Sequence, residues 1–184
     1  MNVVDQIRNF AAVLPSGRRN RMDLLSWLLR RPQVLAAVGG YETALVLSGR
    51  LDTRLKYLAE LKAAALITCE YCMDIGSAFA RRAGITAAQL RELPRFRDSD
   101  EFTADEKLVL EFAEAMTRIP TTIDQELRER LLARFTRAQL TELATTIAWE
   151  NHRGRLNQAL GVRPSGFSDD AACVLPERPA AMPG

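Results

Sequence analysis

The sequence predicts an all-α protein, with one helical domain over residues 1–162 and an extended or disordered tail over residues 163–184. Apolar residues recur every three or four positions through most of the chain, which is the period of an amphipathic helix. Residues that cap helices precede many of these segments, and no stretch alternates apolar and polar residues long enough to indicate a strand. A length of 184 residues is enough for one domain with its own core.

The first half of the chain contains five predicted helices, which cover residues 3–14, 22–30, 34–47, 52–67 and 69–83. Proline and glycine separate the early ones, at Pro15–Gly17 and at Pro32. Gly39 and Gly40 weaken the third helix by about 1 kcal/mol each relative to alanine. Asp52 is the expected N-cap of the fourth.

The second half contains four predicted helices, which cover residues 86–93, 103–118, 124–135 and 136–160. Three of them begin with a capping box, in which a threonine is followed three residues later by Gln or Glu. The pairs are Thr86 with Gln89, Thr103 with Glu106, and Thr136 with Gln139. The remaining helix is capped by Thr122 or Asp124.

Composition and charge exclude several classes of protein. A net charge of +2, with arginines only in short pairs, argues against nucleic-acid binding. The longest nearly apolar run, Ala63 to Ile67, is far shorter than the roughly 20 residues that span a bilayer. Residues 1–14 contain Asp5 and Arg8 and do not resemble a signal peptide. We therefore expect a cytoplasmic protein without membrane association, in a compartment where thiols are kept reduced.

The strongest chemical signal is Cys69-Glu70-Tyr71-Cys72 at the start of a predicted helix. Two cysteines on one helical turn are close enough to form a disulfide, and the helix N-terminus favours the thiolate, most of all at Cys69. Such a pair in a reducing compartment indicates redox chemistry; the alternative is two buried cysteines that act as small hydrophobic residues. A zinc site that adds His152 and Cys173 would require the tail to fold back, so we expect no metal and no cofactor.

Two segments of the chain resemble the carboxymuconolactone decarboxylase superfamily. They are Leu51 to Ala78, which includes Cys-Glu-Tyr-Cys-Met-Asp-Ile-Gly, and Glu150 to Gly161, which ends in Asn-Gln-Ala-Leu-Gly. The cysteine pair is typical of the AhpD-type alkylhydroperoxidase branch, and the resemblance covers roughly residues 20–162. It implies an AhpD-like helical fold that assembles as a homo-oligomer. It also implies a peroxidase that reduces organic hydroperoxides in antioxidant defence and is re-reduced by a lipoyl-type or other dithiol partner.

The resemblance implies that Cys72 attacks the peroxide and that Cys69 resolves the product. The helix-dipole argument instead favours Cys69 as the more acidic thiol, so both assignments stay open. Two positions depart from the pattern of this branch: Gly76 stands where a His is usual, and Tyr57 stands where a Glu is usual. A phenol with an unperturbed pKa of about 10 is a poor base at neutral pH.

Three residues are candidates to replace the altered proton relay. Glu60 lies in the helix before the cysteines, and Glu150 and His152 lie in the closing helix. His152 is the only histidine of the chain, and its unperturbed pKa of about 6.5 suits proton transfer. The alternatives are a surface histidine and a structural polar cluster or subunit interface around Glu150.

Other functions for the same fold remain open at this stage. One is a non-catalytic or stress-sensing oligomeric protein, and another is a carboxymuconolactone decarboxylase-like lyase. Trp27 and the apolar segment from Val34 to Leu47 provide more apolar helix than one small core needs. We therefore predict a homo-oligomer with part of the N-terminal third at the interface.

Overall fold

The computed structural model describes residues 3–20, 22–168, 173–174 and 176–177. Within these residues the protein is helical and contains no strand, which confirms the predicted fold class. The helices are α1 (Val3–Val13), α2 (Asp23–Leu28), α3 (Pro32–Leu47), α4 (Thr53–Ile67), α5 (Glu70–Arg82), α6 (Ala87–Glu92), α7 (Ala104–Thr117), α8 (Gln125–Arg134) and α9 (Arg137–Ala159). Short 3₁₀ turns follow α1 at Leu14–Ser16 and α6 at Leu93–Arg95.

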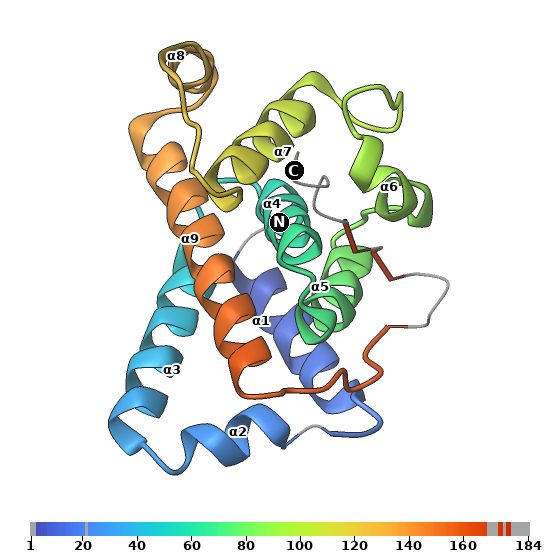
Figure 1. Ribbon diagram of the computed structural model, residues 1–184, viewed down its shortest axis with the longest axis vertical. Helices are drawn as coiled ribbons and strands as arrows, with labels where there is room; N and C mark the ends of the chain where they lie inside the picture. The colour runs from blue at the N-terminus through green and yellow to red at the C-terminus, as the bar shows by residue number, and fades with distance from the viewer. Residues whose placement is uncertain (1–2, 21, 169–172, 175, 178–184) are drawn as a thin grey trace, which may run out of the picture.

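Helix α4 forms the centre of the fold and packs against α5, α7 and α9 (Figure 1). Ten of its fifteen residues are buried, including two lysines. Buried cations are tolerated only when they are paired. Lys56 Nζ lies 2.7 Å from Glu142 of α9, and Lys62 Nζ lies 3.3 Å from Glu114 of α7 and 2.6 Å from Glu177 of the tail. Charge pairs thus join the central helix to its neighbours.

The predicted helix starts are confirmed where local hydrogen bonds define them. All three capping boxes are present, and Asp52 and Asp124 accept hydrogen bonds as N-caps of α4 and α8. Pro32 is the first residue of α3, a position where proline costs nothing because no intrahelical partner exists for its missing N–H. The third helix therefore begins two residues earlier than predicted.

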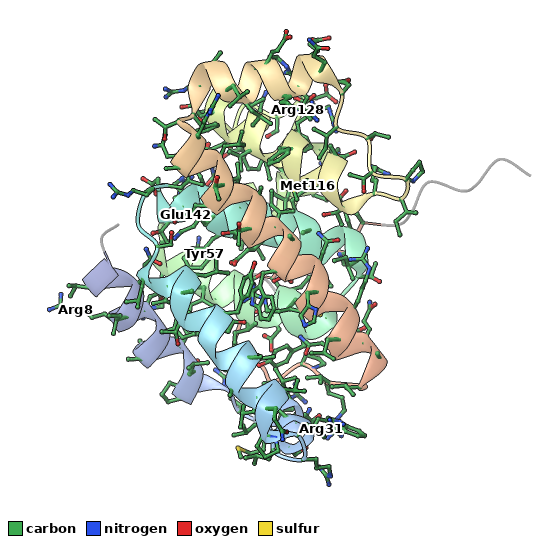
Figure 2. The ribbon with its side chains drawn as sticks, turned by 90° about the vertical axis from the view of Figure 1, so that its left-hand side faces the viewer. Arg8, Arg31, Tyr57, Met116, Arg128 and Glu142 are labelled. Atoms are coloured by element: carbon green, nitrogen blue, oxygen red, sulfur yellow. A yellow bond between two sulfur atoms is a disulfide. The ribbon has the colours of Figure 1, made fainter. Side chains whose placement is uncertain are left out.

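The N-terminal helices cover one side of α4 and α5. Asn9 of α1 donates from Nδ2 to the carbonyl oxygen of Phe79 (3.2 Å), and the rings of Phe10 and Phe79 lie 4.8 Å apart. Helix α3 crosses in front of Tyr57 beside α9 in Figure 2. None of its residues is buried within this chain. This side of the molecule is therefore where the fold is least enclosed.

The described part of the tail is held against α4 and α5 by hydrogen bonds. Asp74 of α5 accepts hydrogen bonds from the backbone N–H groups of Ser165 (2.8 Å), Gly166 (2.7 Å) and Ser168 (2.9 Å). Further on, Glu177 N–H donates to the Ala65 carbonyl oxygen at 3.0 Å. The rest of the predicted tail, residues 169–172, 175 and 178–184, lies outside the described residues.

No helix in the described ranges is long and apolar enough to cross a membrane.

Candidate active site

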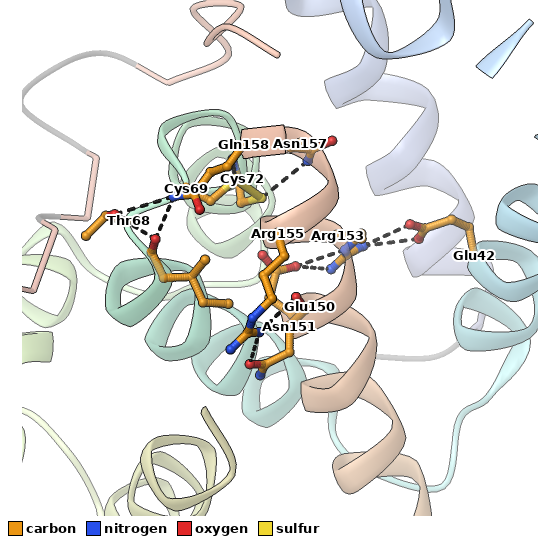
Figure 3. The surroundings of a disulfide bond; sticks show 11 residues. Glu42, Thr68, Cys69, Cys72, Glu150, Asn151, Arg153, Arg155, Asn157 and Gln158 are labelled. Carbon is orange, nitrogen blue, oxygen red and sulfur yellow. Dashed lines mark hydrogen bonds and ion pairs between the residues drawn. A yellow bond between two sulfur atoms is a disulfide. The ribbon is translucent and has the colours of Figure 1, made fainter. Parts of the chain in front are cut away.

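The two cysteines of the CxxC motif lie at the junction of α4 and α5. Helix α4 ends at Thr68, whose left-handed conformation (φ 59°) turns the chain into α5. Cys69 is the N-cap of α5, and its Sγ accepts a hydrogen bond from Cys72 N–H at 3.3 Å. The Cα atoms of Cys69 and Cys72 are 5.2 Å apart, and the two sulfurs are joined in a disulfide (Figure 3).

Of the two cysteines in the motif, Cys72 is the one that lines the main cavity of the described residues. Cys72 lines a cavity of about 250 Å³, whereas Cys69 is 1% exposed and does not contribute to the cavity wall. Asn157 of α9 donates from Nδ2 toward Cys72 Sγ at 3.5 Å (Figure 3). A molecule in the cavity would therefore meet the Cys72 sulfur first.

The cavity wall is apolar along much of its length and comes from α1 and the 3₁₀ turn after it, and from α2, α3, α4, α5 and α9. Its apolar part includes Phe10, Val38, Leu45, Leu61, Ile75 and Phe79. Polar side chains are added chiefly by α4 and α9. A small pocket with an apolar body and few polar groups is typical of sites for small organic ligands.

Three carboxylates share one guanidinium in this wall. Arg153 donates to Glu150 Oε2 (2.5 Å), to Glu60 Oε1 (3.0 Å) and to both oxygens of Glu42 (3.1 and 3.2 Å). Trp149 Nε1 also donates to Glu42 at 2.8 Å, so helix α3 is fastened to α9. With all groups ionised the cluster would carry two uncompensated negative charges, which favours retention of a proton.

Burial raises the pKa of Glu150 to about 7, with the opposing effect of Arg153 and a further rise from the Glu60 charge. Burial also raises the pKa of Glu60, against the charge of Arg153. Arg153 touches both carboxyls, so their titrations are coupled. Near pH 7 the cluster can therefore both accept and release a proton.

Tyr57 lies in the same cavity wall, where the related branch has its usual Glu. Its hydroxyl oxygen accepts a hydrogen bond from Asn9 Nδ2 at 3.4 Å, and burial raises the phenol pKa further above its ordinary value. Gly76 also lines the cavity, and a Cβ placed there would lie 3.0 Å from Leu61 Cδ2. Leu61 thus occupies space that a side chain at position 76 would need.

The structure brings Cys72, Tyr57, Glu60 and Glu150 to one cavity but not His152. The His152 side chain is exposed and its ring stacks against Trp149, with centroids 4.7 Å apart. Residues two apart on a helix point about 200° apart, so Glu150 and His152 cannot face the same side of α9. Of the two candidates from this helix, only Glu150 lines the cavity that Cys72 also lines.

The sequence contained a further signal in α9. Thr146, Glu150, Arg153 and Asn157 follow the i, i+4, i+7, i+11 spacing of one helix face, and all four line the cavity. Gln6 of α1 and Glu42 of α3 were not identified from the sequence. They join the site only through tertiary contacts, so no local spacing marks them.

The sequence is similar to known proteins of one family. Residues 32–115 match the carboxymuconolactone decarboxylase family. The uncharacterised protein YnjA of Escherichia coli strain K12 is 36% identical over 129 residues, which are 70% of this chain and 68% of YnjA. The chain belongs to the carboxymuconolactone decarboxylase family. A second relative, the uncharacterised protein YdfG of Bacillus subtilis strain 168, is 27% identical over 107 residues, which are 58% of this chain and 73% of YdfG.

Solved structures show the same fold in proteins of low sequence identity. One is a protein of unknown function from Agrobacterium tumefaciens, named as a candidate AhpD antioxidant defence protein. It has a TM-score of 0.71 at 23% identity and covers 75% of this chain and 94% of that chain. A cysteine-to-alanine variant of the debrominase Bmp8, in complex with 2,3,4-tribromopyrrole, has a TM-score of 0.70 at 22% identity and covers 76% of this chain and 75% of that chain. This fold is therefore used by more than one kind of enzyme.

Proposed function

We propose that this protein is a dithiol peroxidase that reduces organic hydroperoxides through Cys72 and Cys69. The observation that carries the proposal is the position of Cys72. Its sulfur forms a disulfide with Cys69 and lies in the wall of a mostly apolar cavity that also contains Glu60, Glu150 and Arg153. Membership of the carboxymuconolactone decarboxylase family and the AhpD-like fold also support a dithiol peroxidase.

In the first step the Cys72 thiolate attacks the terminal oxygen of the hydroperoxide and breaks the O–O bond. Cys72 becomes a sulfenic acid, and the alkoxide leaves and takes a proton as an alcohol. In the second step the Cys69 thiol attacks the Cys72 sulfur, forms the disulfide and releases water. A dithiol reductant then exchanges with the disulfide, restores both thiols and is itself oxidised to a disulfide.

The buried carboxyl groups of Glu150 and Glu60 accept and return the proton that moves in the first step. The proton that leaves the Cys72 thiol passes to the Glu150–Glu60 cluster, directly or through the substrate, and returns to the alkoxide. A carboxyl with a pKa of about 7 is suited to both directions at neutral pH. Asn157 Nδ2 supports the sulfur anion by donating to Cys72 Sγ.

Three matched Cys→Ser variants test the proposal with cumene hydroperoxide and dihydrolipoamide as substrates. We expect Cys72→Ser to abolish turnover. Cys69→Ser should consume about one equivalent of peroxide and stop at a sulfenic acid, which mass spectrometry detects as an added oxygen. Cys173→Ser makes the same chemical change in the tail and should turn over as the parent does.

The same experiment tests which of the two cysteines attacks the peroxide and which resolves the sulfenic acid. A single turnover by Cys72→Ser, with the added oxygen on Cys69, would reverse the assignment. Turnover by a variant that lacks both Cys69 and Cys72 would contradict dithiol chemistry altogether.

A further inference from the structure

The cavity contains buried polar atoms that the described protein leaves without a partner. Among the described residues, no hydrogen-bond partner lies near Gln6 Nε2, Thr146 Oγ1 or Glu150 Oε1. All three side chains line the cavity, and they are 4%, 1% and 3% exposed. A buried polar atom without a partner costs roughly 1–3 kcal/mol, so three of them in one cavity indicate a place built for a polar ligand.

The contacts of Lys56 determine which end of the Gln6 amide is free. Lys56 Nζ donates to the Ser48 carbonyl oxygen (2.7 Å), to Glu142 Oε1 (2.7 Å) and to Gln6 Oε1 (3.5 Å). An ammonium group offers three donors and no acceptor, so the oxygen of Gln6 must face it. The nitrogen of Gln6 is therefore left as a donor for something else.

Thr146 lies near the same end of the cavity. It follows Glu142 by one helical turn on α9 and precedes Glu150 by another. Asn157, which contacts Cys72, is eleven residues further along α9, a distance of about 16 Å at 1.5 Å per residue. Along α9, Thr146 is thus separated from the reactive sulfur by Glu150 and Arg153, and apolar side chains line much of the rest of the cavity. Gln6 lies near Thr146's end, because Lys56 contacts both Gln6 and Glu142.

We propose that Gln6 and Thr146 form a second polar subsite that binds an uncharged oxygen of the substrate, a hydroxyl or a carbonyl. The proposal rests on the proposed function and names its substrate class: an organic hydroperoxide with an apolar middle and a second, neutral oxygen function at its far end. Gln6 Nε2 donates to that oxygen, and the Thr146 hydroxyl either donates to it or accepts from it.

The surrounding charges exclude an ionised group at this subsite. The positive charge of Lys56 is already paired with Glu142, and the Arg153 cluster carries more carboxylates than cations. A substrate carboxylate would therefore be repelled by its neighbours. A substrate ammonium would leave the Gln6 donor without a partner and would approach Lys56.

Binding of unreactive probes to the oxidised, disulfide-containing protein tests the subsite without any redox step. The probes are hexane-, octane- and decanediol with hydroxyls at both ends, and the mono-alcohols of the same lengths, measured by calorimetry. We expect at least one diol to bind about tenfold more tightly than its mono-alcohol, because only the diol pairs the buried polar atoms at both ends. The hydroxy acid of that length should bind more weakly than the diol.

Thr146→Val should remove the preference for the diol and bring the ratio of the two affinities close to one. Gln6→Met should reduce the same ratio. Thr145→Val makes the identical change one residue away, at a side chain that does not line the cavity, and should keep the tenfold ratio.

Equal binding of diols and mono-alcohols at every length would overturn the subsite, as would a tenfold ratio that survives Thr146→Val. Both of these binding results are obtained with the disulfide intact, so they do not depend on the reactivity of Cys69 or Cys72. Absence of a diol preference in the parent protein, together with intact turnover of cumene hydroperoxide, would refute the subsite alone. A diol preference without any cysteine-dependent turnover would refute the proposed peroxidase and leave the subsite standing.

Discussion

Glu150→Gln separates a proton-transferring role for this carboxyl from a structural one, because the two roles predict opposite effects. The pKa of Glu150 is raised from 4.5 to about 7, so the folded protein binds this proton more tightly than the unfolded chain does. Its contribution to stability is fully present below about pH 4.5 and is lost as the pH rises to 7. A shift of this size corresponds to about 3 kcal/mol as an upper limit, at about 1.4 kcal/mol per pKa unit.

Glutamine has nearly the same shape and cannot ionise. We therefore expect the unfolding free energy of Glu150→Gln to lack the loss between pH 4.5 and 7 that the parent shows, so that the variant is the more stable protein at pH 8. Arg153 keeps Glu42 and Glu60 as partners in the variant, which limits the cost of the change. Urea unfolding at pH 5, 6, 7 and 8 measures the difference.

The same variant should be a poorer peroxidase despite its stability. General acid–base assistance contributes roughly 10²–10⁴-fold, so single-turnover reduction of cumene hydroperoxide at pH 7 should slow by at least about 10². Glu129→Gln, on the exposed side of α8, is the matched control. It should change neither the pH dependence of the unfolding free energy nor the rate of peroxide reduction. Parent-like peroxide reduction by Glu150→Gln would refute the proton-transfer role, and an unchanged pH profile of stability would refute the raised pKa.

Two further predictions concern the tail and the assembly. Asp74→Asn should lower the free energy of unfolding in urea by about 2–3 kcal/mol, because one amide oxygen cannot replace a buried carboxylate that accepts bonds from Ser165, Gly166 and Ser168. Asp98→Asn makes the same change at an exposed position and should leave the free energy of unfolding unchanged. Equal effects of the two substitutions would argue against an anchored tail. Light scattering at micromolar concentration should show a homo-oligomer, because Trp27, Leu29 and Leu47 are 46%, 56% and 57% exposed on the N-terminal side; a monomer would contradict this.

The helices were predictable from the sequence because local bonds define their ends. Thr86, Thr103 and Thr136 each bond a backbone N–H three residues ahead, and such spacing is visible in the sequence itself. The start of α3 was placed less accurately, since Pro32 is compatible with the first turn of a helix as well as with the end of the preceding one.

The candidate site was predictable only in part. The cysteine motif and Glu150 carry their chemistry in their residue types, so both were identified. His152 was an equally good candidate by type, and only its angle around α9 separates it from the cavity. Gln6 and Glu42 lie 66 and 30 residues before Cys72, and nothing short of the packing of α1 and α3 brings them to it.

Some residues of the cavity wall lie within the part of the chain that matches the family, and others lie outside it. Cys72 and Glu60 lie within residues 32–115, the range that matches the family, whereas Gln6 and Thr146 lie outside it. Glu150 and Asn157 of the reacting end also lie outside this range, but Gln6 is the one of these residues that comes from α1, a helix that has no part in the cysteine chemistry. A substitution in α1 could redirect such a protein to a new compound while its sulfur chemistry is inherited unchanged.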